Sequence, residues 1–308
     1  ALAGGDAMLN NLVESYLALR RSTGFGMKVQ GYLLRSFATF AAGRGERHIR
    51  TSSAIAWAAL APSEGQRANR LGTLRTFARF AKAEDEDHEV PPTSVFASRR
   101  VRYAPFLFSK AQVRQLITRA SKLPPPGSLR PWTCSTFFSL LAVTGMRVSE
   151  ALALRLEHVT PDGLIIRETK FRKSRLIPLH PTTAAGLVRY LDRRRAALDD
   201  HVFVSTRGTG IRYSTVNAIF LRIVREMGIH PGPGSRGPRI HDLRHGFAIR
   251  VLEASPTSRQ GVDAHMLALS TYMGHGRLDS TYWYLHATPH VLNGIAEATE
   301  SFGRGEKP

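Results

Sequence analysis

The sequence is poor in cysteine and in long apolar runs. Its 308 residues include a single cysteine, Cys134, so no disulfide can form within the chain and a reducing compartment is expected. No apolar run reaches the roughly 18 residues that a membrane-spanning helix requires. The first residues, ALAGGDAMLNN, lack the basic and then apolar layout of a signal peptide, so we expect a cytoplasmic location.

Acidic residues are also scarce relative to basic ones. The chain has 43 Lys and Arg against 24 Asp and Glu, a formal net charge of +19. A folded chain with this charge is expected to bind a polyanion. Nucleic acid is the first candidate and an anionic membrane surface the second, while a merely solvated basic surface stays open. Hydrophobic residues make up 43% of the sequence, enough to form proper cores rather than a disordered tail.

A break in composition near residues 83–105 indicates two domains. AEDEDHE is acidic, VPPTSVFAS contains paired prolines, and RRVRYAP is basic. We therefore predict a helical domain over residues 1–88, a linker over 89–105 and a second domain over 106–308. Residues 1–86 carry 12 basic and 7 acidic side chains, a net charge of +5, which leaves +14 for the rest. Both domains could thus meet the same polyanion.

Apolar residues recur at helical spacing through most of the first domain. The helix expected over residues 64–83 should turn one apolar face to the core, formed by Leu74, Phe77, Ala78 and Ala81. A neighbouring face of this helix is basic and consists of Arg75, Arg79 and Lys82. This stripe could hold the helix against DNA phosphates, and a solvated helix face is an equally open interpretation.

The second domain is expected to be helical with one β-hairpin. Ser109 and Gln112 have the spacing of a capping box, so a helix should begin after Ser109. PWTCSTFFSLLAVTG predicts a buried helix that ends at Gly145, and RVSEALALRLEHV predicts the next helix. Two short apolar runs flank a polar centre in GLIIRETKFRKSRLIPL, which indicates a β-hairpin. Further helices are expected over residues 182–197, 214–227, 241–252 and 289–302.

Several polar residues of the second domain could act together on a phosphodiester. One arginine stands at a turn-to-helix junction in TGMRVSEALAL, and a histidine and an arginine share a helix face in HDLRH. A lysine lies near the hairpin tip, and a histidine precedes a tyrosine by nine residues. Each of these taken singly is more often an ordinary surface or core residue. The set is Arg147, Lys170, His241, Arg244, His275 and Tyr284.

These residue types match what cleavage of a phosphodiester needs. The charge of the phosphate repels nucleophiles, so cations must surround its non-bridging oxygens, and arginine supplies a permanently charged planar fork. A base must accept the proton of the attacking phenol, and an acid must protonate the departing alkoxide. Attack by tyrosine conserves the bond as a phosphotyrosine for later rejoining. No Asp, Glu and His spacing typical of a metal site accompanies the set, so neither a metal nor another cofactor is expected.

Four motifs in order resemble the tyrosine recombinase (phage integrase) family, close to its Xer branch. TGMRVSEALAL resembles the first conserved box, TKFRKSRLIPL the lysine hairpin, HDLRHGFA the H-x-x-R box and MGHGRLDSTYWYLH the ending with Y-x-H. The resemblance covers roughly residues 105–290. Residues 1–86 are similar in size and character to the family's core-binding domain. The fold that the resemblance implies is mainly α with a small β-hairpin or sheet: a helical core-binding, DNA-binding domain followed by an α+β catalytic domain.

The resemblance also implies roles for the site residues. Arg147, Arg244 and His275 would hold the scissile phosphate. Lys170 would reach the minor groove and protonate the leaving 5′ oxygen. His241 would act as general acid and base beside the tyrosine.

Tyr284 is the expected nucleophile, because it stands in the Y-x-H context of YLH. Tyr282 is the second candidate, and Tyr272 is expected to be a packing residue. Glu150 matches the supporting acid of R-x-S-E and is expected to orient the site rather than take part in the chemistry.

The implied activity is site-specific recombination of double-stranded DNA through a 3′-phosphotyrosine, independent of metal. Members of the family act as tetramers on two DNA sites, so a homotetramer at the nucleoid is expected, with no membrane partner. STYWYLHATPHVL further resembles recombinases carried by mobile elements. Two alternatives stay open: relaxation of a single duplex in the manner of a type IB topoisomerase, and a DNA-binding protein whose catalytic set is inert.

Overall fold

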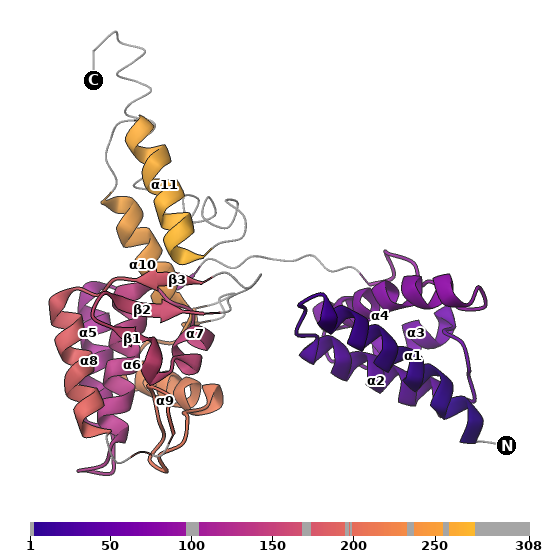
Figure 1. Cartoon of the computed structure of the whole chain (residues 1–308), viewed down its shortest axis with the longest axis horizontal. Helices are drawn as coiled ribbons and strands as arrows, with labels where there is room; N and C mark the ends of the chain where they lie inside the picture. Colours follow the sequence, from indigo (N-terminus) through magenta and orange to yellow (C-terminus); the bar gives the residue numbers. More distant parts are fainter. Residues whose placement is uncertain are drawn as a thin grey trace, which may run out of the picture. The chain divides into compact units, whose positions relative to one another are not determined.

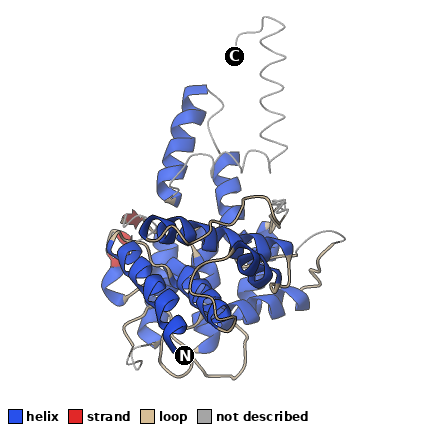
Figure 2. Ribbon diagram, turned by 90° about the vertical axis from the view of Figure 1, so that its right-hand side faces the viewer, coloured by secondary structure: helices blue, strands red, loops and turns tan. Residues whose placement is uncertain are grey.

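The computed structural model describes residues 3–96, 105–167, 174–194, 197, 199–232, 237–254 and 259–274. The chain divides into two compact units, Ala1–Arg102 (unit 1) and Tyr103–Pro308 (unit 2), and each is described by itself (Figure 1). Helices dominate the described chain, and the strands form one small sheet (Figure 2). The predicted fold class is therefore confirmed. Among the described residues, no helix combines the length and the hydropathy needed to cross a membrane.

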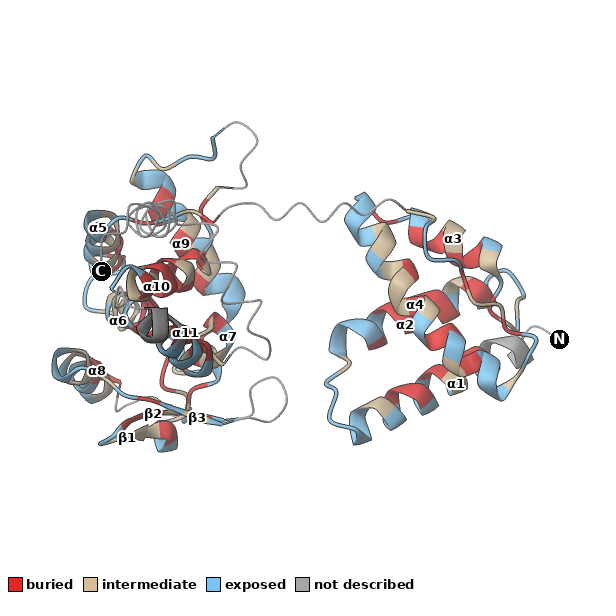
Figure 3. Ribbon diagram, turned by 90° about the horizontal axis from the view of Figure 1, so that it is seen from above, coloured by how far each residue is buried: buried red, intermediate tan, exposed pale blue. Residues whose placement is uncertain are grey.

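Unit 1 is a helical bundle in which α1, α2 and α4 pack against one another, and α3 packs against both α2 and α4. Buried residues lie on the faces that these helices turn toward one another (Figure 3). The short α3 was not predicted, whereas the core face predicted for α4 is confirmed, since all its members are buried. The helices are α1 (Ala3–Ser22), α2 (Lys28–Ala42), α3 (Thr51–Ala59) and α4 (Glu64–Glu84).

The first part of the predicted linker packs on unit 1. Val90, Val95 and Phe96 are partly buried against the unit 1 core, and the backbone N–H of Glu89 donates a hydrogen bond of 2.9 Å to the carbonyl of Ile49. Residues 97–104 lie outside the described residues.

Unit 2 consists mainly of helices, with a small antiparallel sheet of order β1-β2-β3 at one edge of its described residues (Figure 3). The pairing of β2 with β3 confirms the predicted hairpin, and Ile166 faces Arg175 across it. The hairpin tip, with Lys170, lies outside the described residues. The elements are α5 (Lys110–Ala120), α6 (Arg130–Thr144), α7 (Val148–Ala153), η1 (Leu156–His158), β1 (Val159–Thr160), β2 (Gly163–Ile166), β3 (Arg175–Ile177), α8 (Pro181–Arg193), α9 (Tyr213–Glu226), α10 (Asp242–Glu253) and α11 (Arg259–Met273).

Two local predictions for unit 2 are confirmed by hydrogen bonds and backbone angles. The Ser109 hydroxyl accepts from the N–H of Gln112 at 3.1 Å, and the N–H of Ser109 donates to Gln112 Oε1 at 2.9 Å, which completes the capping box. α6 ends at Gly145, whose φ is 60°. A Cβ at Gly145 would also collide with the ring of Phe247, so glycine is required both for the turn and for the close packing of α10.

The helix predicted over RVSEALALRLEHV is shorter than expected, because α7 ends at Ala153. The next residue, Leu154, is extended, and its carbonyl accepts a hydrogen bond from the N–H of Val202 at 2.8 Å. The N–H of Leu156 donates to the carbonyl of Asp200 at 2.9 Å. Pairing with a distant segment thus replaces the last turns of the helix.

Candidate functional site

Arg147 is placed by the sharp turn between α6 and α7. It is the N-cap residue of α7, directly after the glycine that ends α6 and the buried Met146. Its Nη2 donates to the carbonyl of Gly274 at 2.7 Å, and its Nη1 donates to Glu150 Oε1 at 2.7 Å. The side chain keeps 29% exposure, so the guanidinium is held by the protein yet reaches the surface.

Arg244 lies on the first turn of α10 and is buried, with 3% exposure. Its Nη1 donates to the carbonyl of Gly145 at 2.6 Å, and its Nη2 donates to the carbonyl of Met273 at 2.7 Å. Arg147 and Arg244, nearly a hundred residues apart in sequence, thus bind the carbonyls of two consecutive residues at the end of α11. Both guanidiniums are therefore anchored at the same point of the backbone, the end of α11.

Gly274 follows α11, and both its backbone angle and its neighbours favour glycine there. Its φ is +65°, and a Cβ there would lie 2.9 Å from Arg175 Nη1 and 3.6 Å from Arg147 Nη1. The guanidiniums therefore approach the backbone of this residue closely. The next residue, His275, lies outside the described residues, as do Lys170, Tyr282 and Tyr284.

His241 is half-buried at the start of α10. Burial, followed by the positive charges of Arg244, Arg239 and Arg147, lowers the pKa of His241 to about 4. At neutral pH its imidazole is therefore uncharged and can accept a proton. Its ring meets that of His245 edge to face, with 4.8 Å between the centroids.

Glu150 accepts hydrogen bonds on both carboxylate oxygens. Oε1 accepts from Arg147 Nη1 at 2.7 Å and from Arg175 Nη1 at 3.1 Å. Oε2 accepts from the backbone N–H of Arg147 at 2.8 Å and from Arg175 Nη2 at 2.7 Å. Burial alone would raise the pKa of Glu150, but the bonds from Arg175 and Arg147 outweigh it and hold the pKa below its ordinary value.

Arg175 was missed by the sequence reasoning. One signal was available, because residues two apart in a strand share a face and Ile177 is an apolar core residue. Ile177 is indeed fully buried, and Arg175 points to the same side with only 12% of its side chain exposed. Tyr272, by contrast, stacks on Phe247 with 5.6 Å between ring centroids and packs against the core, as predicted.

The basic residues predicted to contact DNA lie on α4 in unit 1. Arg79 and Lys82 are exposed and Arg75 is half-buried. A separate groove of unit 1, with a volume of about 730 Å³, runs along α4 beside the end of α1 and the start of α2. Polar side chains that line this groove include Arg20, Gln30, Asn69 and Thr73.

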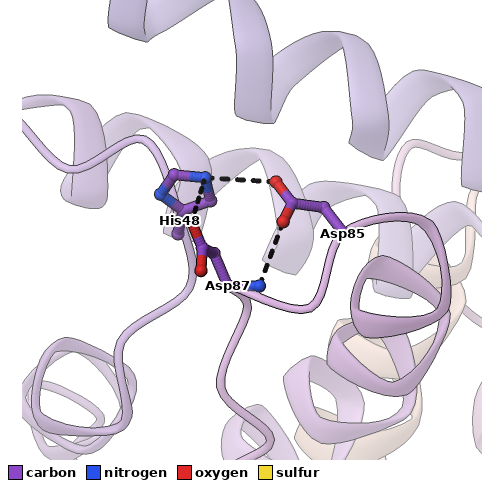
Figure 4. A group of neighbouring side chains, drawn as sticks. All are labelled: His48, Asp85 and Asp87. Carbon is purple, nitrogen blue, oxygen red and sulfur yellow. Dashed lines mark hydrogen bonds and ion pairs between the residues drawn. The ribbon is translucent and has the colours of Figure 1, made fainter.

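Two groups of side chains with metal-binding donors occur among the described residues. The first joins residues that are distant in the sequence, and the second consists of three consecutive residues. In unit 1, His48 Nε2 lies 3.1 Å from Asp85 Oδ2 and 3.9 Å from Asp87 Oδ2, and Asp85 Oδ1 accepts from the N–H of Asp87 at 3.0 Å (Figure 4). These contacts fix the segment before α3 to the end of α4. In unit 2 the second group consists of Asp199, Asp200 and His201.

Residues 107–290 match the model of the phage integrase family. This chain belongs to the phage integrase family. It is 37% identical over 293 residues to a putative integrase/recombinase, y4rB, of Sinorhizobium fredii, covering 91% of this chain and 93% of the relative. It is 27% identical over 239 residues to the tyrosine recombinase XerD of Lacticaseibacillus casei, covering 76% of each.

Solved integrase structures share the fold. The Tn1549 transposon integrase, in complex with transposon right end DNA, superposes with a TM-score of 0.66 at 17% identity over 94% of this chain and 99% of that one. A lambda integrase dimer bound to a COC′ core site gives a TM-score of 0.62 at 19% identity, covering 90% and 76%. The predicted family and enzyme class are thus confirmed: this phage integrase family member is a tyrosine recombinase, an enzyme of site-specific recombination.

Proposed function

We propose that this recombinase cuts and rejoins double-stranded DNA with Tyr284 as nucleophile. One observation carries the assignment of the site. Arg147 and Arg244, from separate elements, meet at the end of α11, one residue before His275. The order of the motifs and the convergence of these two arginines support a phosphate site at this place.

The charges of the described residues suit a phosphodiester. Arg147 and Arg175 share one carboxylate, Glu150, and Arg244 binds the backbone beside them, so these four groups together carry a net charge of +2. In such a half-buried place, fixed cations stabilise the charge that develops on the non-bridging oxygens more strongly than they would in water. We assign Arg147, Arg244 and His275 to this task.

The proton transfers follow from the remaining residues. The phenol oxygen of Tyr284 attacks phosphorus as its proton passes to the neutral His241, and a P–O bond to the tyrosine forms. The P–O5′ bond breaks, and Lys170 protonates the departing 5′ oxygen. The 3′ end stays attached to the enzyme as a phosphotyrosine until the 5′ hydroxyl of a second strand attacks it, which reverses the same steps.

We further propose that unit 1 serves as the core-binding domain, with Arg75, Arg79 and Lys82 on the phosphate backbone, and that the enzyme acts as a homotetramer on paired sites at the nucleoid. A lambda integrase of similar fold forms a tetramer bound to a Holliday junction, which supports this assembly. The likeness to a transposon integrase and to the y4r proteins favours an element-borne role.

The test uses a pool of nicked duplexes of random sequence, in which cleavage releases a short fragment and traps the covalent complex. The wild-type chain should form an adduct that survives denaturation, and sequencing the joined DNA gives the target site. Tyr284→Phe should bind this DNA and form no adduct, whereas the matched variant Tyr282→Phe should form it. An adduct with Tyr284→Phe but not with Tyr282→Phe would refute the assignment of the nucleophile.

The same assay separates the alternatives. A shift of the DNA on a native gel without any adduct would indicate an inert DNA-binding protein. Relaxation of a plasmid that lacks the recovered site would favour a topoisomerase-like activity.

A further inference from the structure

We propose that Arg175 is a positioning residue for DNA cleavage, which acts through Glu150 to fix the guanidinium of Arg147. The proposal rests on the proposed function, because it concerns the arginine assigned to the scissile phosphate. Arg175 lies within the lysine-hairpin motif TKFRKSRLIPL but is not one of the predicted catalytic residues. It nevertheless contacts the same carboxylate as Arg147 and lies against the backbone just before His275.

The carboxylate of Glu150 is shared evenly between the two arginines. Arg175 binds it through both terminal nitrogens, at 3.1 and 2.7 Å, in the fork-to-fork geometry that fixes orientation best. Arg147 contributes one side-chain nitrogen and its backbone N–H. Each oxygen thus accepts two hydrogen bonds, and the other terminal nitrogen of Arg147, Nη2, is left for the carbonyl of Gly274.

Loss of Arg175 would redistribute these bonds. Glu150 has 8% side-chain exposure, so water cannot readily replace the two missing donors. The buried carboxylate would then draw the guanidinium of Arg147 into a two-point pair of its own. This would turn Arg147 away from Gly274 and neutralise the charge that a phosphate requires. Arg175 therefore leaves the positive charge of Arg147 less compensated by Glu150 and keeps its guanidinium correctly oriented.

The place of Arg175 in the fold joins three parts of the site. It opens β3, the strand that returns from the hairpin carrying Lys170, and it pairs with Ile166 of β2. It reaches α7 through Glu150, and its Nη1 would lie 2.9 Å from a Cβ at Gly274, at the end of α11. One side chain thus links the base of the lysine hairpin, the Arg147 turn and the segment that leads to His275.

Burial argues that this arginine is more than a packing residue. The Nε of Arg175 is buried and has no hydrogen-bond partner among the described residues. An apolar side chain at this strand position would pack beside the core and leave no donor unsatisfied. Replacing a buried ion pair by apolar residues is also often neutral or stabilising, so stability alone does not call for an arginine here. The geometry toward Glu150 and Arg147 gives a reason for an arginine here.

The test measures single-turnover adduct formation by the full chain on the nicked duplex recovered with the wild type, together with DNA affinity and melting temperature. Arg175→Gln should slow adduct formation about 10- to 100-fold, as expected when a supporting contact of a catalytic group is lost, with DNA affinity within about threefold. Arg175→Lys, which keeps the charge but not the two-point geometry, should slow adduct formation at least about tenfold. It also serves as the test variant if Arg175→Gln fails to fold.

Arg194→Gln is the matched control, because Arg194 is also buried with an unpartnered Nε, at the end of α8. It should lower the melting temperature and leave the adduct rate within about twofold.

A double-variant cycle distinguishes positioning from general destabilisation. In the Arg175→Gln background, Glu150→Gln removes the carboxylate that captures Arg147, so it should restore the adduct rate by about fivefold or more. A merely structural Arg175 would give a further loss instead, and that result would overturn the inference. An adduct rate of Arg175→Gln and Arg175→Lys equal to wild type would overturn it as well, while the proposed function would stand. If the wild type forms no adduct with any duplex, the proposed function itself fails.

Discussion

At the scale of single residues, the site depends on how the protein environment changes ordinary side chains. Burial lowers the pKa of His241 most, and the positive charges of three arginines lower it further, so the imidazole stays uncharged at a pH where a free histidine is partly protonated. The pKa of Glu150 is also lowered, because its arginine partners outweigh the effect of burial, and for a carboxyl group this favours the ionised form. A neutral base and a fixed array of cations therefore lie within the same small region.

The titration of His241 can be measured by NMR in the DNA-free chain. Because the folded state lowers its pKa, the neutral form should persist from pH 8 down to about pH 5, and protonation should occur with a midpoint near the pKa of about 4. His241→Gln identifies the resonance by its disappearance. Arg244→Gln should raise the midpoint, since it removes the positive charge that lowers the pKa of His241 most. A midpoint close to the ordinary value of 6.5 in the wild-type chain would contradict this account.

Gly274→Ala should lose cleavage activity because its added Cβ collides with a side chain of the site. Gly228→Ala is the control for backbone strain alone. Gly274 and Gly228 have φ values of +65° and +73°, so alanine costs a similar backbone strain of about 1–2 kcal/mol at each. A Cβ at Gly228 meets nothing within 4 Å, whereas at Gly274 it displaces Arg175. Thermal melts should therefore show comparable destabilisation, while only Gly274→Ala should slow adduct formation, by about tenfold or more. Equal rates for the two variants would show that this close approach is dispensable.

At the scale of elements, features that depend on neighbouring residues were predicted correctly, whereas contacts between distant segments were not. The capping box at Ser109 and the end of α6 at Gly145 depend only on residues close in the sequence. The helices α8, α9 and α10 begin within one residue of the predicted positions. α7 is shorter than predicted because Leu154 pairs with Val202, nearly fifty residues away. The mutual approach of Arg147, Arg175 and Arg244 likewise depends on packing between distant elements.

The basic stripe on α4 gives an element-scale prediction for DNA affinity. Each cation that neutralises a phosphate adds about 0.9 to the slope of log K against log salt concentration. Arg79→Gln and Lys82→Gln should each weaken binding to any duplex and reduce this slope by about 1, measured by fluorescence anisotropy over a series of salt concentrations. Arg79→Lys keeps the charge and should preserve the slope. An unchanged slope in the two Gln variants would mean that this face is only solvated.

At the scale of the whole molecule, the described chain contains separate hydrophobic cores. The core of unit 1 gathers residues between Leu9 and Ala81, and that of unit 2 gathers residues between Phe108 and Leu243, with a smaller cluster between Ala248 and Met273. Each unit thus buries its own apolar side chains, as independent folding units do.

Calorimetry of the full chain should therefore resolve two unfolding transitions. Phe77→Ala removes a fully buried ring from the unit 1 core, and Phe137→Ala does the same in unit 2. Each should lower the free energy of unfolding by about 3–5 kcal/mol, and each should shift only the transition of its own unit. A single transition displaced by both variants would show that the two units unfold together.

The family, the mainly helical fold, the caps and stops of individual helices and the basic character of the chain could be predicted from the sequence. Motifs and periodicity involve only neighbouring residues, and net charge is a sum over the chain. The packing of the folded chain was needed to show that α7 stops early, that Arg147 and Arg244 hold adjacent carbonyls at the end of α11, and that Arg175 shares Glu150 with Arg147. Those contacts join residues up to 127 positions apart. No local pattern specifies them, because they arise only when separate elements pack against one another.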